Sequence, residues 1–467
     1  MKIKIRWSLA VALLAFVSTR SFATEFHVGP KQKLQAVSDV PWESLKAGDQ
    51  VLIDWRPEPY KEKWVICCKG TEKAPIVVRG VPGPKGTLPV IDGNGASTRK
   101  QLQFWGDVRG TIKVGGAIVP KGSDAEYIVI ENLEVRGARP PFTFIDAQGQ
   151  PKSYLVTASA LYVEKAHHLT VRNCILTDSA HGLFVSSNNE SASSDILVEG
   201  CYFSENGMEG GTQHSIYTAA IGITFQFNHL APLRAKCVGN NLKDRSAGLV
   251  VRYNWIEAGD KNLDLVDGED SVLVRNHPSY RKTFVYGNVF IKTPVSTHNQ
   301  LVHYGGDSKF GSYYRKGTLY FYNNTIVSYR KDPMSLFWLS SDEETCDFRN
   351  NILYSTTNSK FFAVKDKGIM HLSHNFLPEN WLTPATDPRG AVKDDGTSTK
   401  RMNPGFVDIA AQDFRLSAVS KCRDAGTTLL PECLPANAPI AEYMKEQQSR
   451  PRPNDGHLDI GAYEFDR

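Results

Sequence analysis

Short apolar stretches separated by polar residues recur along most of the chain with a common motif. The motif is an apolar residue, two mostly polar residues, Asn or Gly, and further apolar residues. It appears in the segments VIENLEV, TVRNCIL, LVEGCYF, FQFNHL, VRYNWI, VYGNVF, FYNNTI, FRNNIL and LSHNFL. The Asn or Gly positions are Asn132, Asn173, Gly200, Asn228, Asn254, Asn288, Asn324, Asn351 and Asn375. They are roughly 24 to 41 residues apart, many near 26 to 28, and inserted loops account for the longer intervals.

Each repeat has the composition of short β-strands. Its apolar stretches are rich in Val, Ile, Phe and Tyr, and no amphipathic helical stretch separates them. Two or three short strands per repeat with Asn near a corner are typical of a right-handed parallel β-helix, whose coils stack about 4.8 Å apart. Stacked Asn side chains can hydrogen-bond from coil to coil, which explains why the position repeats. A β-propeller blade needs four strands and about 40 residues, so most repeats are too short for it.

The pattern predicts one elongated all-β domain between residues 24 and 402. GDQVLID, KAPIVVRGVPG and LPVIDGNG near its start read as the first coils. From Asn403 the composition changes, and NPGFVD, DFRLSAVSKCRDAGT and DIGAYEF predict a C-terminal capping segment over residues 403–467. Such a segment is expected because an open β edge at the last coil invites aggregation.

The first 23 residues have the features of a signal peptide. Lys2, Lys4 and Arg6 precede a short apolar stretch, and Ser21-Phe22-Ala23 resembles a cleavage site. No later stretch reaches about 18 apolar residues. We therefore expect a bacterial protein that is secreted or periplasmic, with no membrane partner.

Export makes the eight cysteines candidates for disulfide bonds. Cys422 and Cys433 lie close together in the C-terminal segment and are the best pair. Cys174 and Cys201 follow equivalent repeat positions, so we expect them to stack, either as a disulfide or as buried free thiols.

The net charge of +4 is small for a chain of 467 residues. It gives no support for nucleic-acid binding, although local basic clusters could still attract an anionic polymer. We expect a monomer.

A second strand in each repeat carries the candidate chemistry. If Leu183, Ile216, Leu242, Leu263 and Leu301 point into the core, the residues that follow them point outward, because side chains alternate along a strand. Those residues are Phe184, Tyr217, Lys243, Asp264 and Val302. Tyr217, Lys243 and Asp264 would form a row along a shallow groove, with Arg245 on the same face. His214 and His303 lie near this row, and Arg252 and Lys236 lie in the flanking segments. The candidates for binding substrate are Asp264, His303, Tyr304, Arg252 and Lys236.

The opening GDQVLID and KAPIVVRGVPG, the repeated Asn corners and the closing NPGFVD and DIGAYEF resemble secreted β-helical polysaccharide lyases of the alginate lyase and chondroitinase B type. The resemblance covers most of the chain and implies a lyase acting on an anionic, uronate-containing polysaccharide by β-elimination. In that family a Lys on such a strand acts as the base, and LKDRS matches its strand. One coil later the family has Arg-His-Gly, whereas this chain has Val266 and Asp267 in LDLVDG, so the family's acid is missing.

β-Elimination needs a group that neutralises the sugar carboxylate, a base for the C5 proton and a donor to the leaving oxygen. We expect Lys243 to be the base, because the neighbouring cation Arg245 should lower the pKa of its ammonium group. Arg245 or Arg252 would hold the carboxylate in a fork. Tyr217 or His214 would donate the proton.

Calcium assists some of these enzymes. Asp264, Asp267 and Glu269 are candidate ligands, although the spacing is not that of an EF-hand.

Structural roles for the same residues stay open. Lys243 can pair with Asp264, Arg245 can pair with Asp244 or Asp267, and Arg252 beside Asn254 can be structural. His214 is expected to be functional because a polar group beside Tyr217 is costly to bury.

Two other functions also stay open. One is a β-helical glycoside hydrolase with an Asp/Glu pair such as Asp264 and Asp267. The other is a non-catalytic carbohydrate-binding solenoid.

Overall fold

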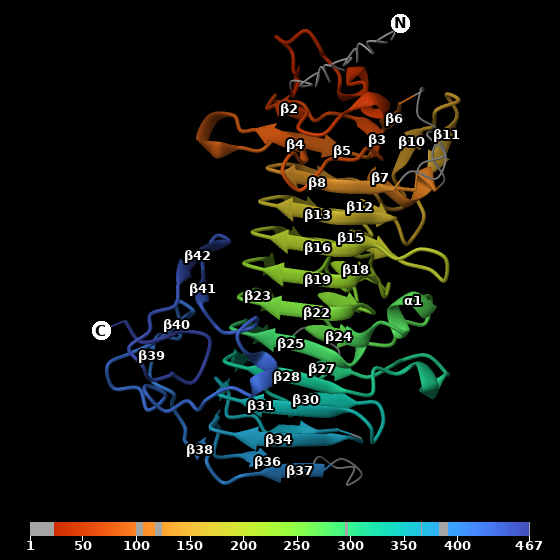
Figure 1. Ribbon diagram of the computed structural model, residues 1–467. Helices are drawn as coiled ribbons and strands as arrows, with labels where there is room; N and C mark the ends of the chain where they lie inside the picture. Colours follow the sequence, from red (N-terminus) through yellow and green to blue (C-terminus); the bar gives the residue numbers. More distant parts are fainter. Residues whose placement is uncertain are drawn as a thin grey trace, which may run out of the picture.

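The structure, a computed structural model, describes residues 23–99, 106–116, 124–294, 298–365, 367–382 and 391–466. Its architecture is a right-handed parallel β-helix, in which three long sheets run along a stack of coils (Figure 1). The predicted signal peptide lies almost wholly outside the described residues. Within these ranges, no helix is long and apolar enough to cross a membrane.

The first sheet has 13 strands, paired in parallel. They are β1 (Glu25–Val28), β2 (Gln50–Asp54), β4 (Ile76–Val81), β8 (Ala125–Glu131), β13 (Ala166–Arg172), β16 (Ser194–Glu199), β19 (Ile221–Gln226), β22 (Ala247–Arg252), β25 (Lys282–Tyr286), β28 (Thr318–Tyr322), β31 (Thr345–Arg349), β34 (Ile369–Ser373) and β37 (Ala391–Asp394).

The second sheet has 14 strands and is parallel except where β10 meets β11. They are β3 (Glu62–Ile66), β6 (Ala96–Thr98), β7 (Gly110–Val114), β10 (Thr143–Ile145), β11 (Pro151–Ser153), β12 (Ser159–Glu164), β15 (His181–Ser186), β18 (Ile216–Thr218), β21 (Leu242–Asp244), β24 (Leu263–Leu265), β27 (Gln300–Tyr304), β30 (Met334–Leu339), β33 (Phe361–Val364) and β36 (Trp381–Leu382).

The third sheet has 11 short strands. They are β5 (Val90–Asp92), β9 (Glu134–Arg136), β14 (Ile175–Thr177), β17 (Tyr202–Ser204), β20 (His229–Leu230), β23 (Trp255–Glu257), β26 (Val289–Lys292), β29 (Thr325–Ser328), β32 (Ile352–Ser355), β35 (Phe376–Leu377) and β38 (Thr399–Lys400).

Among the described residues, helical structure is confined to single turns. The α-helix α1 spans Val272–Arg275. The 3₁₀ turns are η1 (Val37–Asp39), η2 (Trp42–Ser44), η3 (Pro84–Gly86), η4 (Asp107–Arg109), η5 (Pro278–Arg281), η6 (Gly311–Tyr313) and η7 (Pro431–Cys433).

The core is a continuous column of apolar side chains inside the coils. Leu183, Ile216, Leu242 and Leu263 stack at one position of the second sheet and are fully buried. Because successive strands pair in register, each coil buries the apolar face of its neighbours.

A ladder of Asn side chains fixes one corner of the β-helix. It runs through Asn228, Asn254, Asn288, Asn324, Asn351 and Asn375. Each of the first five donates from its backbone N–H and its side-chain Nδ2 to the Oδ1 of the next, at 2.9–3.2 Å. The predicted coil-to-coil bonding is confirmed.

The alignment of the earlier repeats was wrong by one residue. Asn132, Asn173 and Gly200 have positive φ and occupy the corner position just before the ladder. The ladder position is Cys201 in the coil before Asn228, since Cys201 N–H donates to Asn228 Oδ1 at 2.9 Å. Asn suits both positions, because its side chain tolerates left-handed backbone as well as stacking.

We expect replacing Asn288 by Ala to lower the free energy of unfolding by about 2–4 kcal/mol, because it leaves several buried polar groups without a hydrogen-bond partner. The Asn288 amide donates to Val251 O at 2.9 Å and accepts the Asn254 N–H at 2.9 Å. Urea unfolding measures the change. The control is Asn403→Ala at an exposed turn. Equal, small losses for both variants would contradict a stabilising ladder.

The C-terminal segment packs along the side of the β-helix (Figure 1). Its hairpins are β39 (Phe406–Asp408) with β40 (Asp413–Leu416), and β41 (Ala441–Met444) with β42 (Gln448–Pro451). Phe414 and Tyr443 contact Trp255 on the outer face of the third sheet. The outer face of the third sheet carries large apolar residues, which the segment buries. The segment therefore covers a lateral apolar face rather than the edge of the last coil.

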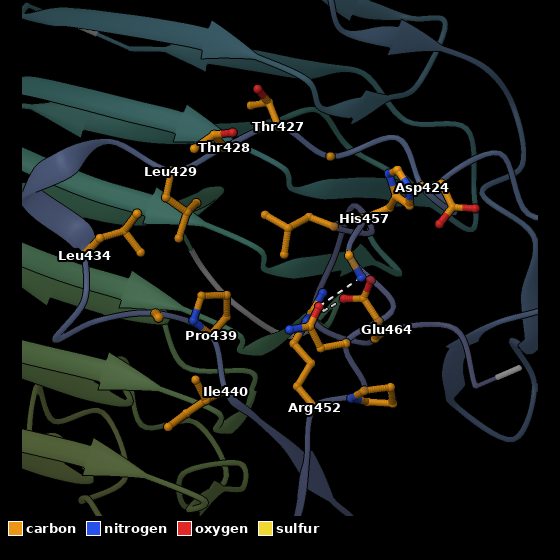
Figure 2. Close-up of a pocket in the computed structure, with 16 residues that line it drawn as sticks. Asp424, Thr427, Thr428, Leu429, Leu434, Pro439, Ile440, Arg452, His457 and Glu464 are labelled. Carbon is orange, nitrogen blue, oxygen red and sulfur yellow. Dashed lines mark hydrogen bonds and ion pairs between the residues drawn. The ribbon is translucent and has the colours of Figure 1, made fainter.

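A cavity of about 620 Å³ lies within this segment (Figure 2). Its buried ion pair joins Arg452 Nε to Glu464 Oε2 at 2.7 Å. All of its lining residues belong to the C-terminal segment, so it is separate from the second sheet.

Of the two predictions made for the cysteines, one was wrong and one is confirmed. Cys422 and Cys433 are free thiols that pack in different apolar clusters, so the predicted disulfide is absent. Cys174 and Cys201 occupy the same position in successive coils, as predicted, and are buried free thiols.

Candidate active site

The outward side chains of the second sheet form a row, which we call the outward row. It consists of Phe184, Tyr217, Lys243, Asp264 and His303, at matching positions of β15, β18, β21, β24 and β27. The register predicted from the sequence is confirmed for the first four. It was wrong at β27, where Val302 pairs with Leu263 in the core and His303 points outward.

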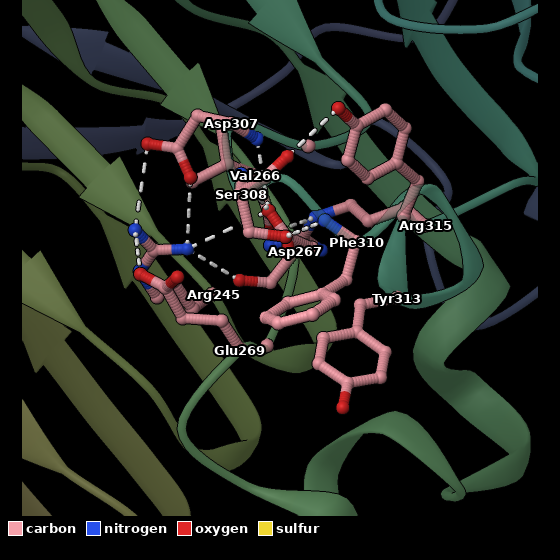
Figure 3. Close-up of polar contacts among 12 residues, drawn as sticks. Arg245, Val266, Asp267, Glu269, Asp307, Ser308, Phe310, Tyr313 and Arg315 are labelled. Carbon is pink, nitrogen blue, oxygen red and sulfur yellow. Dashed lines mark hydrogen bonds and ion pairs between the residues drawn. The ribbon is translucent and has the colours of Figure 1, made fainter.

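Arg245 follows β21 and is fixed against the outward row. Its Nε donates to the Tyr217 hydroxyl at 2.8 Å, and its Nη1 donates to Asp267 O at 2.6 Å. Figure 3 shows its guanidinium between the carboxylates of Asp307 and Glu269, at 3.0 and 2.7 Å. The side chain is only 4% exposed, so these contacts hold the guanidinium in one orientation.

Lys243 lies between two carboxylates. Its Nζ is 3.2 Å from Asp264 Oδ2 and forms an ion pair with Asp307. Burial lowers the pKa of Lys243, but the charges of Asp264 and Asp307 outweigh burial and Arg245, so the pKa is raised above its usual value. Arg245 does lower the pKa of Lys243, as expected, but the predicted net lowering was wrong because the two carboxylates outweigh it. In the free protein Lys243 is an ammonium cation.

Tyr217 experiences opposing influences. Burial raises the pKa of its hydroxyl, whereas the charge and hydrogen bond of Arg245 and the charge of Lys243 lower it, and the balance is a raised pKa. Tyr217 is therefore a neutral phenol whose oxygen already accepts a charged hydrogen bond. Arg245 would stabilise a phenolate formed during a reaction.

His214 lies beside Tyr217, with ring centroids 5.7 Å apart. Its Nδ1 accepts the Asn240 N–H at 3.0 Å, so in the neutral ring the proton is on Nε2. Burial, together with the charge of His181, lowers the pKa of His214 well below its usual value. The imidazole is neutral and can donate one hydrogen bond from Nε2.

Asp264 orients its neighbours in the outward row. Its Oδ1 accepts from His303 Nδ1 at 2.8 Å, and its Oδ2 accepts from Asn240 Nδ2 at 3.0 Å. Burial raises the pKa of Asp264, but the His303 hydrogen bond and the Lys243 charge lower it well below its usual range. The carboxylate stays ionised and holds Lys243 in place. His303 also stacks on Trp338, with ring centroids 4.1 Å apart.

Three candidates for substrate binding lie away from the outward row. Tyr304 is fully buried in the core, because it alternates with His303 on β27. Arg252 is on the first sheet, bonded to Gln226 Oε1 at 2.8 Å and Tyr286 Oη at 3.1 Å. Lys236 is exposed and pairs with Glu209 at 2.6 Å. The predicted position near the outward row was therefore wrong for these three residues.

The predicted calcium ligands do not suit a metal ion. Asp264 is held by Lys243 and His303, and Asp267 accepts the N–H groups of Asp307 and Ser308 from within the protein. Glu269 pairs with Arg245. In the part of the chain that the structure describes, no group of three or more His, Cys, Asp or Glu side chains is placed to hold a metal.

The same contacts bear on the hydrolase alternative. Asp264 is 3% and Asp267 0% exposed. Neither carboxylate is free to act on a glycosidic bond, so that acid/base pair has no support in the geometry.

Sequence reasoning missed Asp307 and His181. Asp307 lies just after β27, in the segment YGGDS, and contacts both cations of the site. The Gly305-Gly306 pair directly after β27 was a signal that the chain turns back toward the outward row. His181 Nδ1 accepts the His214 N–H at 3.1 Å, a contact between coils that no spacing reveals.

The sequence matches no family model and no curated protein sequence. Among solved structures, the chain is similar to an alginate lyase from Paenibacillus sp. str. FPU-7, with 11% identity, 75% of this chain and 94% of that chain covered, and a TM-score of 0.47. It is also similar to the pectate lyase Pel9A, with 14% identity, coverage of 96% and 98%, and a TM-score of 0.49. A third is a GH136 lacto-N-biosidase from Eubacterium ramulus, with 12% identity, coverage of 81% and 68%, and a TM-score of 0.46.

Proposed function

We propose that the protein is a polysaccharide lyase that cleaves an acidic, uronate-containing polymer by β-elimination. The observation that carries the proposal is the contact between Arg245 Nε and the Tyr217 hydroxyl at 2.8 Å, beside the ammonium group of Lys243 on the same face. This arrangement supplies a phenol that can lose a proton and two cations that can neutralise a carboxylate.

The reaction assigns one role to each group. Lys243 and Arg245 bind the uronate carboxylate, which lowers the cost of carbanion formation at C5. Tyr217 acts as the phenolate that forms when its hydroxyl loses a proton to solvent. This phenolate takes the C5 proton, the electron pair of the broken C5–H bond forms the C4–C5 double bond, and the C4–O4 bond breaks. Tyr217 then returns the proton to the leaving oxygen, assisted by a hydrogen bond from His214 Nε2. We place the base at Tyr217 rather than Lys243 because Asp264 and Asp307 stabilise Lys243 as a cation, whereas Arg245 donates a hydrogen bond to the Tyr217 oxygen and would stabilise its phenolate.

Export is part of the proposal. A signal peptide over residues 1–23 would place a monomeric enzyme outside the cytoplasm, where polymers too large to be imported are met.

The mature chain, residues 24–467, is expected to release unsaturated uronate ends from at least one of alginate, pectate and the glycosaminoglycans. The carbon–carbon double bond forms only by elimination, so ultraviolet absorbance of the product measures it directly. Reducing ends without that absorbance would indicate a hydrolase. Binding of polymer without cleavage of any of them would indicate a non-catalytic solenoid.

A further inference from the structure

Asp307 bridges the two cations of the site. Its Oδ2 forms the ion pair with Lys243 and lies 3.4 Å from Arg245 Nη2, while its Oδ1 lies 3.0 Å from Arg245 Nη1 (Figure 3). One planar carboxylate thus faces the guanidinium in a fork and touches the ammonium group as well. A sugar carboxylate bound by the same two cations needs this geometry.

The backbone at Asp307 is anchored, but its carboxylate is not buried. The N–H groups of Asp307 and Ser308 donate to Asp267 Oδ1 at 2.9 and 3.3 Å. Arg315 N–H closes the loop by donating to Gly305 O at 3.0 Å. The Asp307 side chain is 30% exposed, against 12% for Lys243. Rotation of the Asp307 side chain alone can therefore move its carboxylate away from Lys243 and Arg245.

The charges around the two cations require one protein carboxylate to move away before another carboxylate can bind there. Lys243 and Arg245 face the carboxylates of Asp264, Asp267, Glu269 and Asp307, so they carry no surplus positive charge. Asp264 and Asp267 are buried and held by other donors. Glu269 contacts Arg245 but not Lys243 in the ion pairs of the site. Asp307 is the exposed carboxylate that contacts both cations.

We propose that Lys243 and Arg245 form a carboxylate-binding site that Asp307 occupies in the free protein and that a uronate carboxylate takes over by displacing the Asp307 side chain. The identity of the ligand as a uronate rests on the proposed function. Asp307 is then a specificity-determining residue, because a neutral sugar has no group that can replace its carboxylate on both cations.

The test is binding of sodium D-glucuronate, with D-glucose as the neutral comparison, measured by calorimetry on the full mature chain. Asp307→Asn removes the competing charge with little change of shape, so glucuronate is expected to bind at least about fivefold tighter than to the wild type, with no gain for glucose. The matched control is Asp270→Asn, an exposed neighbour that changes net charge equally without contacting either cation, expected to stay within about twofold.

Unchanged or weaker glucuronate binding by Asp307→Asn would overturn the proposal, as would an equal gain in Asp270→Asn. Asp307→Ser provides a second removal of the charge, and circular dichroism checks that both variants fold. Binding does not depend on cleavage. Tighter binding with no product from any polymer would leave the carboxylate site standing while the lyase reaction fails. Where a polymer is cleaved, kcat/KM is expected to rise in Asp307→Asn, and a fall would overturn the proposal.

Discussion

Lys243→Ala is expected to lower kcat/KM on a cleavable uronate polymer by about 10³-fold, because it removes a cation that would stabilise charge developing on the substrate carboxylate. The loss should appear in steady-state kinetics of unsaturated product formation. The fold should survive, since Asp264 keeps its bonds to His303 and Asn240. Lys236→Ala, which removes an exposed lysine paired with Glu209, is the matched control and should be near wild type.

Lys243→Arg separates the two roles that this lysine could have. Arginine keeps the positive charge but does not lose its proton in proteins, so it cannot act as a base. If Lys243 binds the carboxylate as a cation, the arginine variant should be clearly more active than the alanine variant. If both variants were equally inactive, Lys243 would be the base. If Lys243→Ala were fully active, Lys243 would have no role in the reaction.

Tyr217→Phe is expected to lower kcat by about 10²–10⁴-fold, the range typical of losing a general acid/base group. The substitution removes only the hydroxyl, and the ring keeps its contact with Phe184, whose centroid is 4.9 Å away. Single-turnover kinetics with a binding assay should show lost turnover and retained binding. Activity within a few-fold of the wild type would contradict the role of Tyr217 as the base.

The pH dependence of the wild type follows from the same two groups. Tyr217 must lose a proton to act, and its pKa is raised above its usual value of 10.0, so kcat/KM should increase with pH through the neutral and alkaline range. Lys243 must stay protonated, and its pKa is raised above 10.5, so activity should fall only beyond that pH. An optimum on the acid side of neutrality would contradict these assignments.

The fold was predictable because successive coils of the β-helix repeat the same pattern of apolar and polar residues in the sequence. Successive coils have apolar residues at inward positions, and many have Asn at the ladder position or just before it, so the motif could be aligned without coordinates to within one residue. In the second sheet the alignment failed at His303, where the segment between β24 and β27 contains α1 and η5 and breaks the interval between coils. Period-two alternation cannot fix the register across such an insertion.

Of the candidate site, only residues of the outward row were predictable from the sequence. Tyr217, Lys243 and Asp264 follow from the stacking of coils, but Asp307 reaches the row from a loop, whose path no pattern specifies. That loop reverses the expected electrostatics: the sequence places Arg245 and Asp264 near Lys243, and the loop adds the carboxylate of Asp307, which together with Asp264 raises the pKa of the lysine. The position of the C-terminal segment was likewise hidden, because its composition indicates an apolar face but not the surface that it covers.

β-Elimination is tested most directly by mass spectrometry of the oligosaccharides that the mature chain releases in oxygen-labelled water. Elimination adds no water, so the products are expected to carry an unsaturated terminal uronate, to lack the mass of one water and to contain no label at the cleaved bond. Saturated, labelled products would show hydrolysis and contradict β-elimination.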